Sequence, residues 1–292
     1  MDYYYDCEFL EGQQTKRFLG IPFGKTKPTI DLISIGIVSE DEREYYAISK
    51  DFNLKEAWNR WQQRTGQGDR NNIEPREYWI RENVLKPIWV KKCREGFTLN
   101  GCPLTPYGVK KLFTYKNFKK LIQKYGKSNE QIAKEVYEFT NPIRFGEDGL
   151  CLCNCANTCP NGKTGSAPRC KKDEVVLPVI KLYGYYSAYD HVALCWLFGK
   201  MNDLPAEFPM YTTDLEQELS NRLKTYTSVE LSRVVCPSCK HNVYQAMDYV
   251  KPLITMRECI DDHPKYPKQT NEHDALSDAR WNRDLHNFIK SL

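Results

Sequence analysis

Residues 31–38 of this 292-residue chain read Asp31-Leu32-Ile33-Ser34-Ile35-Gly36-Ile37-Val38. Aliphatic residues alternate here with small ones, which places Ile33, Ile35 and Ile37 on one face of a β-strand. A short polar turn at 39–42 follows, and the next residues, Glu44–Ser49, also favour a strand. We therefore predict an antiparallel β-hairpin.

The rest of the chain alternates between strand and helix patterns. The stretches 3–9 and 175–186 predict strands. Apolar spacing and capping residues predict helices over 76–86 (ending near Pro87), 115–125 (ending at Gly126), 128–140 (with a capping box of Ser128 and Gln131), 188–201, 214–223 and 274–292. A hairpin followed by strand–helix units predicts an α/β fold: a mixed sheet, antiparallel in its first strands and then parallel, flanked by helices.

Composition excludes a membrane-spanning protein. The chain is 41% hydrophobic and 27% charged, its mean hydropathy is −0.64, and its sequence has no long uncharged apolar run. The first residues, Met1–Asp6, lack the basic and apolar segments of a secretory signal. We therefore expect a soluble cytoplasmic protein with no membrane partner.

Charge is unevenly distributed along the chain. Residues 85–127 contain eleven basic residues and one acid, Glu95, so this stretch carries +10 while the whole chain carries +4. An acidic body with a basic arm suits a protein that grips a polyanion. A solvated lysine-rich helix explains the same pattern equally well.

The first candidate site is Asp6-Cys7-Glu8 on the first predicted strand. The two-residue period of a strand puts both carboxylates on one face, about 6–7 Å apart. Carboxylates held together repel unless a cation lies between them, and such hard oxygen ligands select Mg²⁺ or Mn²⁺. The alternative is a pair of solvated acids at an exposed strand end.

Two further acids and a histidine lie at helix starts. Asp190 follows a predicted strand and opens a helix, where ligands bind in α/β sheets, although a helix-capping role also explains it. His273 and Asp278 form an H-x₄-D motif that leads into the last helix. A histidine before a helix is often structural, and Asp274 competes locally with Asp278 for a functional role.

In this order, D-x-E, a helix-leading Asp and H-x₄-D resemble the signature of DEDDh-type 3′→5′ exonucleases. The local sequence resembles the mycobacterial-type 3′→5′ exoribonuclease family more closely still. The stretches that carry this resemblance are 5–9, 31–38, 44–49, 79–85, 188–195 and 273–280. The resemblance extends over roughly residues 1–85, 128–140, 176–231 and 270–290.

The resemblance implies an RNase H-like fold and a two-metal hydrolase. Asp6, Glu8, Asp190 and Asp278 would hold two Mg²⁺ or Mn²⁺ ions, and His273 would act as general base. The expected reaction removes nucleoside 5′-monophosphates from the 3′ end of single-stranded RNA or of a 3′ overhang. The exonuclease core would comprise residues 1–85 and 176–292.

Residues 86–175 form an insertion outside this core, with a basic helical arm, a family-like helix at about 128–140 and a cysteine-rich loop. A small CxxC insertion at 232–245 interrupts the second part of the core. The lysines of the arm are candidates for phosphate binding, with the neighbouring aromatic rings stacking on bases. These lysines are Lys110, Lys111, Lys116, Lys119 and Lys120. Alternatively, the apolar residues at 118, 121, 122 and 125 form a small core, which leaves the lysines free.

The twelve cysteines are clustered rather than evenly spread, which in a reducing compartment favours metal ligation over disulfides. Candidate ligands of a structural Zn²⁺ are Cys151, Cys153, Cys155, Cys159, Cys170, Cys236, Cys239 and His241. Only the CxxC at 236–239 has the usual spacing of half a zinc site, so ligation and free thiols both stay open. Cys7 and Cys195 are expected to be buried thiols.

Two other functions remain as alternatives. The same acidic site would serve a 3′→5′ DNA exonuclease, because no motif here reads the ribose 2′-hydroxyl. The second alternative is a zinc-bearing, nucleic-acid-binding adaptor with an inactive nuclease fold. Such a binder does not need four carboxylates and a histidine together. Dimerisation is common in the resembled family, but insertions can block an interface, so a homodimer and a monomer both stay open.

Overall fold

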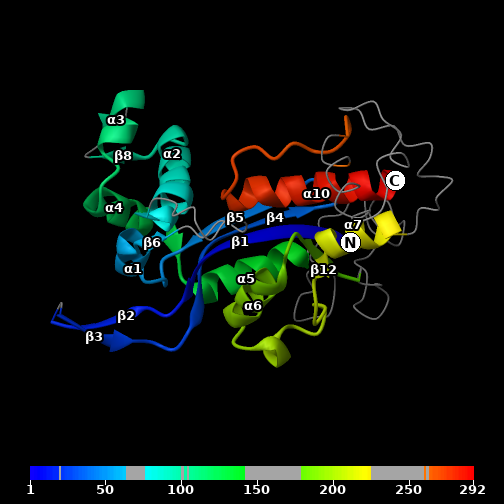
Figure 1. Cartoon of the computed structure of the whole chain (residues 1–292), viewed down its shortest axis with the longest axis horizontal. Helices are drawn as coiled ribbons and strands as arrows, with labels where there is room; N and C mark the ends of the chain where they lie inside the picture. The colour runs from blue at the N-terminus through cyan, green and yellow to red at the C-terminus, as the bar shows by residue number, and fades with distance from the viewer. Residues whose placement is uncertain are drawn as a thin grey trace, which may run out of the picture.

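A six-stranded sheet is the central layer of the computed structural model, which describes residues 1–19, 21–63, 76–99, 102–103, 105–141, 179–224, 260 and 263–292 (Figure 1). Its strands, in spatial order, are β10 (Gly126–Lys127), β5 (Glu44–Ser49), β4 (Thr29–Ser39), β1 (Asp2–Gly12), β11 (Lys181–Gly184) and β12 (Thr213–Asp214). β4 is antiparallel to β1 and β5, whereas β11, β12 and β10 run parallel to β1, β11 and β5. The predicted hairpin and the mixed sheet are thus confirmed, and the arrangement is consistent with an RNase H-like fold.

Helices cover both faces of this sheet (Figure 1). The described helices are α1 (Leu54–Asn59), the π-helical turn η1 (Arg81–Leu85), α2 (Lys86–Arg94), α3 (Pro106–Lys111), α4 (Tyr115–Tyr125), α5 (Asn129–Thr140), α6 (Ala188–Leu197), the 3₁₀ turn η3 (Met201–Asp203), α7 (Leu215–Lys224) and α10 (Ala275–Ser291). α5 and α6 pack on the face that carries Tyr3 and Tyr5, and α7 and α10 pack around Tyr4 on the other. None of these helices is long and apolar enough to cross a membrane.

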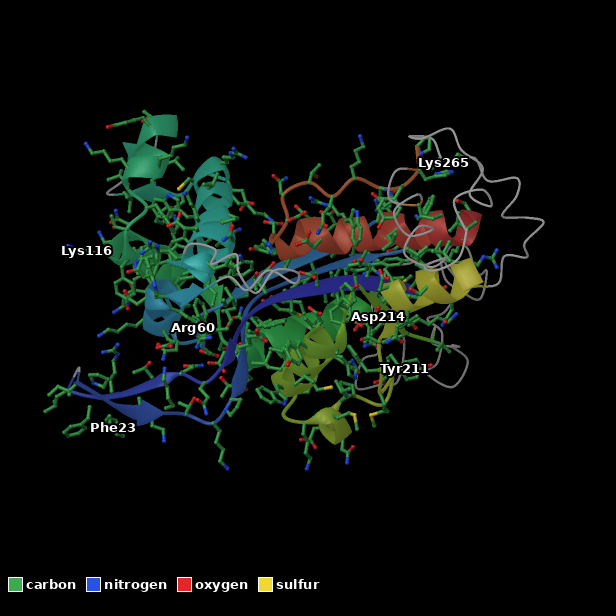
Figure 2. The ribbon with its side chains drawn as sticks, in the orientation of Figure 1. Phe23, Arg60, Lys116, Tyr211, Asp214 and Lys265 are labelled. Carbon is green, nitrogen blue, oxygen red and sulfur yellow. The ribbon has the colours of Figure 1, made fainter. Side chains whose placement is uncertain are left out.

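Three small two-stranded sheets lie outside the central one. They are formed by β2 (Thr15–Phe18) with β3 (Ile21–Lys25), β6 (Gln62–Gln63) with β7 (Arg76–Glu77), and β8 (Thr98–Leu99) with β9 (Cys102–Pro103). The β2–β3 hairpin extends away from the body of the protein, with Phe23 on its outer part (Figures 1 and 2).

A β-bulge corrects the predicted faces of β4. Glu8 pairs with Ser34 and Phe9 with Leu32, so the intervening Ile33 is an extra residue. Ile35 and Ile37 pack in the cluster under α5 and α6, whereas Ile33 packs in a different cluster with α1 and α2. The prediction that Ile33 shares their face is therefore wrong, because the bulge shifts the alternation by one residue.

The helix predicted to end near Pro87 instead continues to Arg94. The turn before Pro87 is π-helical, and the Lys86 amide donates to the Arg81 carbonyl, five residues back. This wide turn places Pro87 in the first turn of α2. Proline is tolerated there because a residue in the first turn does not need to donate a backbone hydrogen bond within the helix. The predicted boundary between core and insertion, at residues 85/86, falls inside this continuous helical segment.

α4 and α5 begin and end where the sequence predicts, whereas the helix predicted over 188–201 ends at Leu197 and α3 was not predicted. Ser128 caps α5, and its hydroxyl accepts from the Gln131 amide at 3.2 Å. Gly126 ends α4, but in an extended conformation that begins β10, rather than in the left-handed cap typical of glycine. A side chain there would bring Cβ within 2.5 Å of the Ile122 carbonyl oxygen.

Gly36 permits the closest contact between the sheet and α10. It lies opposite Asp6 in the β1–β4 pair, and a Cβ atom at this position would overlap the backbone of Ala275 and Leu276. The absence of a side chain at Gly36 thus allows the first turn of α10 to rest directly on β4, next to Asp6.

We predict that Gly36→Ala lowers the free energy of unfolding by about 3 kcal/mol or more, because the added methyl must push α10 off the sheet. Urea denaturation measures this change. Gly108→Ala, whose Cβ would meet only side-chain atoms, Thr105 Oγ1 at 3.2 Å and Leu112 Cδ1 at 3.9 Å, is the matched control and is expected to change stability by less than about 1 kcal/mol. Equal stability of Gly36→Ala and wild type would contradict the close contact.

Candidate active site

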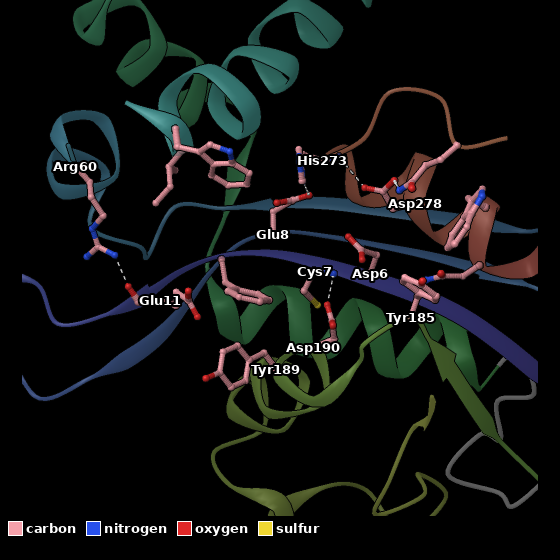
Figure 3. Close-up of a pocket in the computed structure, with 16 residues that line it drawn as sticks. Asp6, Cys7, Glu8, Glu11, Arg60, Tyr185, Tyr189, Asp190, His273 and Asp278 are labelled. Carbon is pink, nitrogen blue, oxygen red and sulfur yellow. Dashed lines mark hydrogen bonds and ion pairs between the residues drawn. The ribbon is translucent and has the colours of Figure 1, made fainter. Parts of the chain in front are cut away.

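A cavity of about 470 Å³ opens between β1, the first turn of α10, α6 and the segment before α2 (Figure 3). Its lining residues are Asp6, Cys7, Glu8, Phe9, Glu11, Arg60, Trp79, Ile80, Tyr185, Tyr189, Asp190, Gln269, His273, Asp278, Trp281 and Asn282. The five predicted catalytic residues are all among them, although they come from three separate parts of the sequence.

Three carboxylates meet in this cavity. Asp6 and Glu8 lie opposite Gly36 and Ser34 in the β1–β4 ladder, so both project from the face of β1 on which α10 rests. Asp6, Glu8 and Asp278 each offer one oxygen, and these oxygens all lie within 4.8 Å of one another. This spacing matches a set of ligands that share a cation.

Hydrogen bonds fix the orientation of Asp278 in the first turn of α10. One carboxylate oxygen accepts from the His273 backbone amide at 2.9 Å, and the other accepts from Gln269 Nε2 at 2.7 Å. No sequence motif predicts this role for Gln269, because it precedes α10 in a segment without helical or strand periodicity. Its amide leaves lone pairs of Asp278 available to a cation.

Asp190 is tied to β1 instead of joining the group of three. β11 pairs with β1 only at residues 2–4, so the Cys7 amide lies beyond the end of the neighbouring strand. The Asp190 carboxylate accepts from this amide at 2.7 Å. On the same strand edge, Asn282 Nδ2 donates to the Tyr5 carbonyl at 3.0 Å. Asp190 thus satisfies a buried backbone group and still faces the cavity.

Burial and mutual repulsion raise the pKa values of these acids. Glu8, Asp190 and Asp278 are 8%, 6% and 6% exposed. Burial is the largest cause of the raised pKa of each, and neighbouring carboxylates add to it. The pKa of Asp190 rises to about 7 and that of Asp278 to about 6, while the pKa of Asp6 lies well above its usual value. A divalent cation would relieve this repulsion, and an all-oxygen donor set suits Mg²⁺ or Mn²⁺.

His273 stands at the edge of this acidic group. Its Nδ1 lies 3.8 Å from Glu8 Oε1, and its ring contacts Trp79 edge-on at 4.8 Å between centroids. Its backbone has φ 65°, a left-handed conformation that is costly for a residue with a side chain. The hydrogen bond from the His273 backbone amide to the Asp278 carboxylate holds this conformation, so the imidazole is directed toward Glu8 (Figure 3).

Two other polar residues near these motifs have structural roles. Asp274 caps α10 by accepting from the Ser277 amide at 3.0 Å, and Lys91 Nζ binds both of its carboxylate oxygens at 3.0 and 2.9 Å. His191 contacts Thr212 and the Met210 carbonyl and does not line the cavity. Neither residue is therefore placed to act with the three grouped carboxylates.

The predicted base-stacking role of the aromatic residues in the basic segment is wrong for most of them. Trp89, Phe97 and Phe118 are buried in one hydrophobic cluster with Leu10, Ile33 and Ile48 of the sheet, because α2 and α4 need an apolar face to pack on it. The predicted small core at 118–125 is part of this cluster.

The five candidate lysines of the arm are exposed on α3 and α4, as Lys116 shows (Figure 2), and none of them lines the cavity. A role for them in nucleic-acid binding stays a prediction. Cys7 and Cys195 are buried free thiols, as expected. The cysteines at 151–170 and the 236–241 segment lie outside the described residues, as does the insertion at 232–245.

Pairs of divalent cations held by protein side chains occur in nucleases, polymerases and phosphatases. Two proteins named 3′-5′ exoribonuclease, from Mycobacterium tuberculosis strains CDC 1551 and H37Rv, are each 28% identical to this chain over 222 residues. The aligned region covers 76% of this chain and 76% of each relative. No protein-family model matches the chain.

The raised carboxylate pKa values predict that the metal-free protein loses stability as the pH rises from 6.5 to 8. In this range the unfolded acids are ionised while the native state still holds protons. A proton that the native state keeps over the whole interval accounts for about 2 kcal/mol, and one on a group with a pKa of about 7, such as Asp190, for about 1 kcal/mol. His286, whose pKa burial lowers to about 4, is neutral in the native state throughout this window, but its unfolded form still loses part of a proton above pH 6.5, so it opposes the trend by only about 0.4 kcal/mol. Urea denaturation in EDTA tests this, and Mg²⁺ is expected to restore stability at pH 8.

Asp190→Asn keeps an acceptor for the Cys7 amide and removes one of these charges, so its stability in EDTA is expected to fall less steeply with pH than that of wild type. Asp284→Asn, which alters an exposed acid on α10, is the control and should follow the wild-type curve. A wild-type stability that rises from pH 6.5 to 8 would contradict the electrostatic account.

Lys91→Met is predicted to lower the free energy of unfolding by about 2–3 kcal/mol, because it leaves the buried Asp274 carboxylate without its cation. Adding Asp274→Asn to this variant should recover part of the loss. Lys86→Met on the same helix breaks an exposed pair with Glu82 and is expected to cost less than about 1 kcal/mol. Equal losses in the two single variants would show that the Lys91 contact is no stronger than a surface pair.

Proposed function

We propose that this chain is a metal-dependent 3′→5′ exoribonuclease that releases nucleoside 5′-monophosphates from single-stranded RNA or 3′ overhangs. One observation carries the proposal: Asp6, Glu8 and Asp278 offer oxygens within 4.8 Å of one another in a cavity that His273 and Asp190 also line. The similarity to two proteins named 3′-5′ exoribonuclease supports the choice of reaction and of RNA.

In this proposal Asp6, Glu8 and Asp278 hold divalent cations, with Asp190 as a further ligand through the oxygen that does not bind the Cys7 amide. When bound, Mg²⁺ or Mn²⁺ supplies positive charge that favours ionisation of the attacking water and stabilises the leaving 3′ oxygen. Gln269 and the His273 amide keep Asp278 in place, so the ligands are oriented before any ion arrives.

His273 is the proposed general base. An imidazole has an ordinary pKa near 6.5, close to the pH at which it must accept a proton from water. Because Nδ1 faces Glu8 Oε1 at 3.8 Å, the carboxylate stabilises the imidazolium that proton transfer creates. Trp79 restricts the rotation of the ring and excludes water from one of its sides.

The shape of the cavity supports cleavage at a strand end. About 470 Å³ lies in the range of pockets that enclose one small ligand, so the cavity suits a single terminal nucleotide better than a duplex. Tyr185 and Trp281, whose rings contact each other, and Tyr189, whose ring contacts Phe9, contribute aromatic surface at two places in the cavity against which a base or sugar can pack. This arrangement favours removal of nucleotides one at a time from a free end.

Digestion of RNA labelled at its 5′ end tests the proposal. With Mg²⁺ we expect a ladder that shortens from the 3′ end and disappears in EDTA. Asp6→Asn should lower the rate at least about 1,000-fold, and His273→Ala about 100- to 10,000-fold with loss of the acidic limb of the pH–rate profile. Asp284→Asn is the matched control and should digest RNA at the wild-type rate.

The same experiment distinguishes the alternatives. A faster ladder on DNA of the same sequence would replace the exoribonuclease with a DNA exonuclease. Tight binding to both strands without cleavage would favour a binding adaptor with an inactive nuclease fold. Internal cuts without shortening from the 3′ end would overturn the exonuclease assignment altogether.

A further inference from the structure

The β2–β3 hairpin is a firmly based arm with an exposed outer part. At its base, Gln14 is buried, its backbone pairs with Thr26, and its side chain binds Thr29, Asp31 and Asn53. Arg60 donates to the backbone carbonyls of Glu11 and Gln13. Beyond this base the hairpin leaves the body of the protein (Figure 1). The arm therefore starts from a fixed position and direction.

The outer part of the hairpin exposes large apolar side chains, although an isolated two-stranded ribbon is only marginally stable in water. Exposed apolar patches of this kind mark interaction sites. Phe18, Leu19, Ile21 and Phe23 are 70%, 88%, 68% and 64% exposed. Leu19 also adopts φ 49° in the turn, a left-handed conformation that glycine or asparagine adopts more easily. A large apolar residue at this position is costly for folding and is explained by contact with a partner.

The charge of the hairpin indicates a polyanionic partner. Residues 15–28 contain Lys16, Arg17, Lys25 and Lys27 and no acid. All four are exposed. Strand register places Lys16 on the same face as Phe18 and Ile21, whereas Arg17 and Lys25 share the other face. Repulsion between two such arms disfavours pairing of one hairpin with another, and acidic phosphates complement it.

The hairpin also begins at the edge of the cavity. Glu11 and Arg60 line the cavity (Figure 3). Thr15, the first residue of β2, is four residues beyond Glu11 in the sequence. Thr15 to Phe18 spans about 10 Å at 3.4 Å per residue, which is about the length of three stacked nucleotide steps. A strand whose 3′ end occupies the cavity and that leaves it past Glu11 and Arg60 can therefore place about three nucleotides along the arm.

From these features we infer that the β2–β3 hairpin binds the single-stranded nucleic acid on the 5′ side of the nucleotide in the cavity. This inference rests on the proposed function for the position of the 3′ end. Phe18 stacks on an unpaired base and Lys16, on the same face of the ribbon, neutralises a phosphate, while Phe23 and Lys25 contact a neighbouring base and phosphate from β3. The hairpin thereby gives longer strands an affinity that a dinucleotide, held by the cavity alone, does not gain.

Fluorescence anisotropy of a labelled 12-nucleotide single-stranded RNA in EDTA tests the inference without cleavage. For Lys16→Ala/Lys25→Ala, the slope of log K against log salt should fall by about 1.4, since two phosphate contacts are lost. For Phe18→Ser/Phe23→Ser, each stacked base that is lost should raise the Kd about 5- to 150-fold. The control Lys134→Ala/Lys200→Ala removes two exposed charges from α5 and the segment after α6 and should leave slope and Kd unchanged.

Both hairpin variants lie outside the hydrophobic clusters, so their thermal unfolding should match that of wild type. In Mg²⁺ they should hydrolyse a dinucleotide at the wild-type rate and a 12-mer with a raised KM. If wild type cleaves no RNA but the binding shifts appear, the proposed function fails and the hairpin inference stands. If wild type cleaves RNA and the variants bind the 12-mer as wild type does, the inference is overturned alone.

Other partners of the hairpin would give different results. Tighter binding to a 12-base-pair duplex than to the single strand would overturn the single-strand assignment. A wild-type dimer that becomes monomeric in Phe18→Ser/Phe23→Ser, with an unchanged Kd for RNA, would show that a second copy covers the arm. Cosedimentation with vesicles containing phosphatidylserine, lost in Lys16→Ala/Lys25→Ala while RNA binding persists, would identify an anionic lipid surface instead.

Discussion

The direct contact between the first turn of α10 and strand β4 at Gly36 is the constraint on which the site depends. Gly36 is the cross-strand partner of Asp6, and any side chain there would occupy the space of the Ala275 backbone. The helix therefore brings Asp278 to within ligand distance of Asp6 and Glu8. Carboxylates separated by about 270 residues in sequence thus meet because a single position lacks a Cβ atom. Their repulsion is tolerated because packing along the rest of α10, around Leu285 and Ile289, holds the helix on the sheet.

The unequal lengths of the central strands explain the remaining site residues. β1 extends beyond the part that β11 covers, which leaves the Tyr5 carbonyl and the Cys7 amide without strand partners. Asn282 and Asp190 satisfy these two groups. The uncovered edge of β1 thus borders the cavity, and its backbone groups need hydrogen-bond partners. Asp190 and Asn282 provide these hydrogen bonds and also line the cavity. Structural and functional roles are combined in the same side chains.

Local rules of sequence predicted much of this arrangement. The two-residue period of a strand placed Asp6 and Glu8 on one face, and capping preferences located the start of α5 at Ser128. Three features could not be predicted from local sequence. They are the bulge that turns Ile33 to the other face, the π-helical turn before Pro87, and the long-range contacts of Gln269 with Asp278 and of Lys91 with Asp274. Each of these depends on tertiary packing, since bulges, wide turns and contacts between distant segments arise only when the elements meet. The basic segment shows the same limit, because its aromatic rings, apt for stacking on bases, are used to pack α2 and α4 on the sheet.

The π-helical turn at residues 81–85 has a consequence for how this region tolerates length changes. A π turn is equivalent to one residue added to an ordinary helix, and each residue of a helix rotates the chain by about 100°. Removing a single residue from this turn would restore regular α-helix and swing the whole of α2 around its axis by that angle. Lys91 would then point away from Asp274, and the apolar stripe of α2 would leave the sheet. The extra residue of the π-helical turn therefore determines which face of α2 packs on the sheet. Insertions and deletions in related sequences are expected to avoid this turn and to fall in the connections on either side of it.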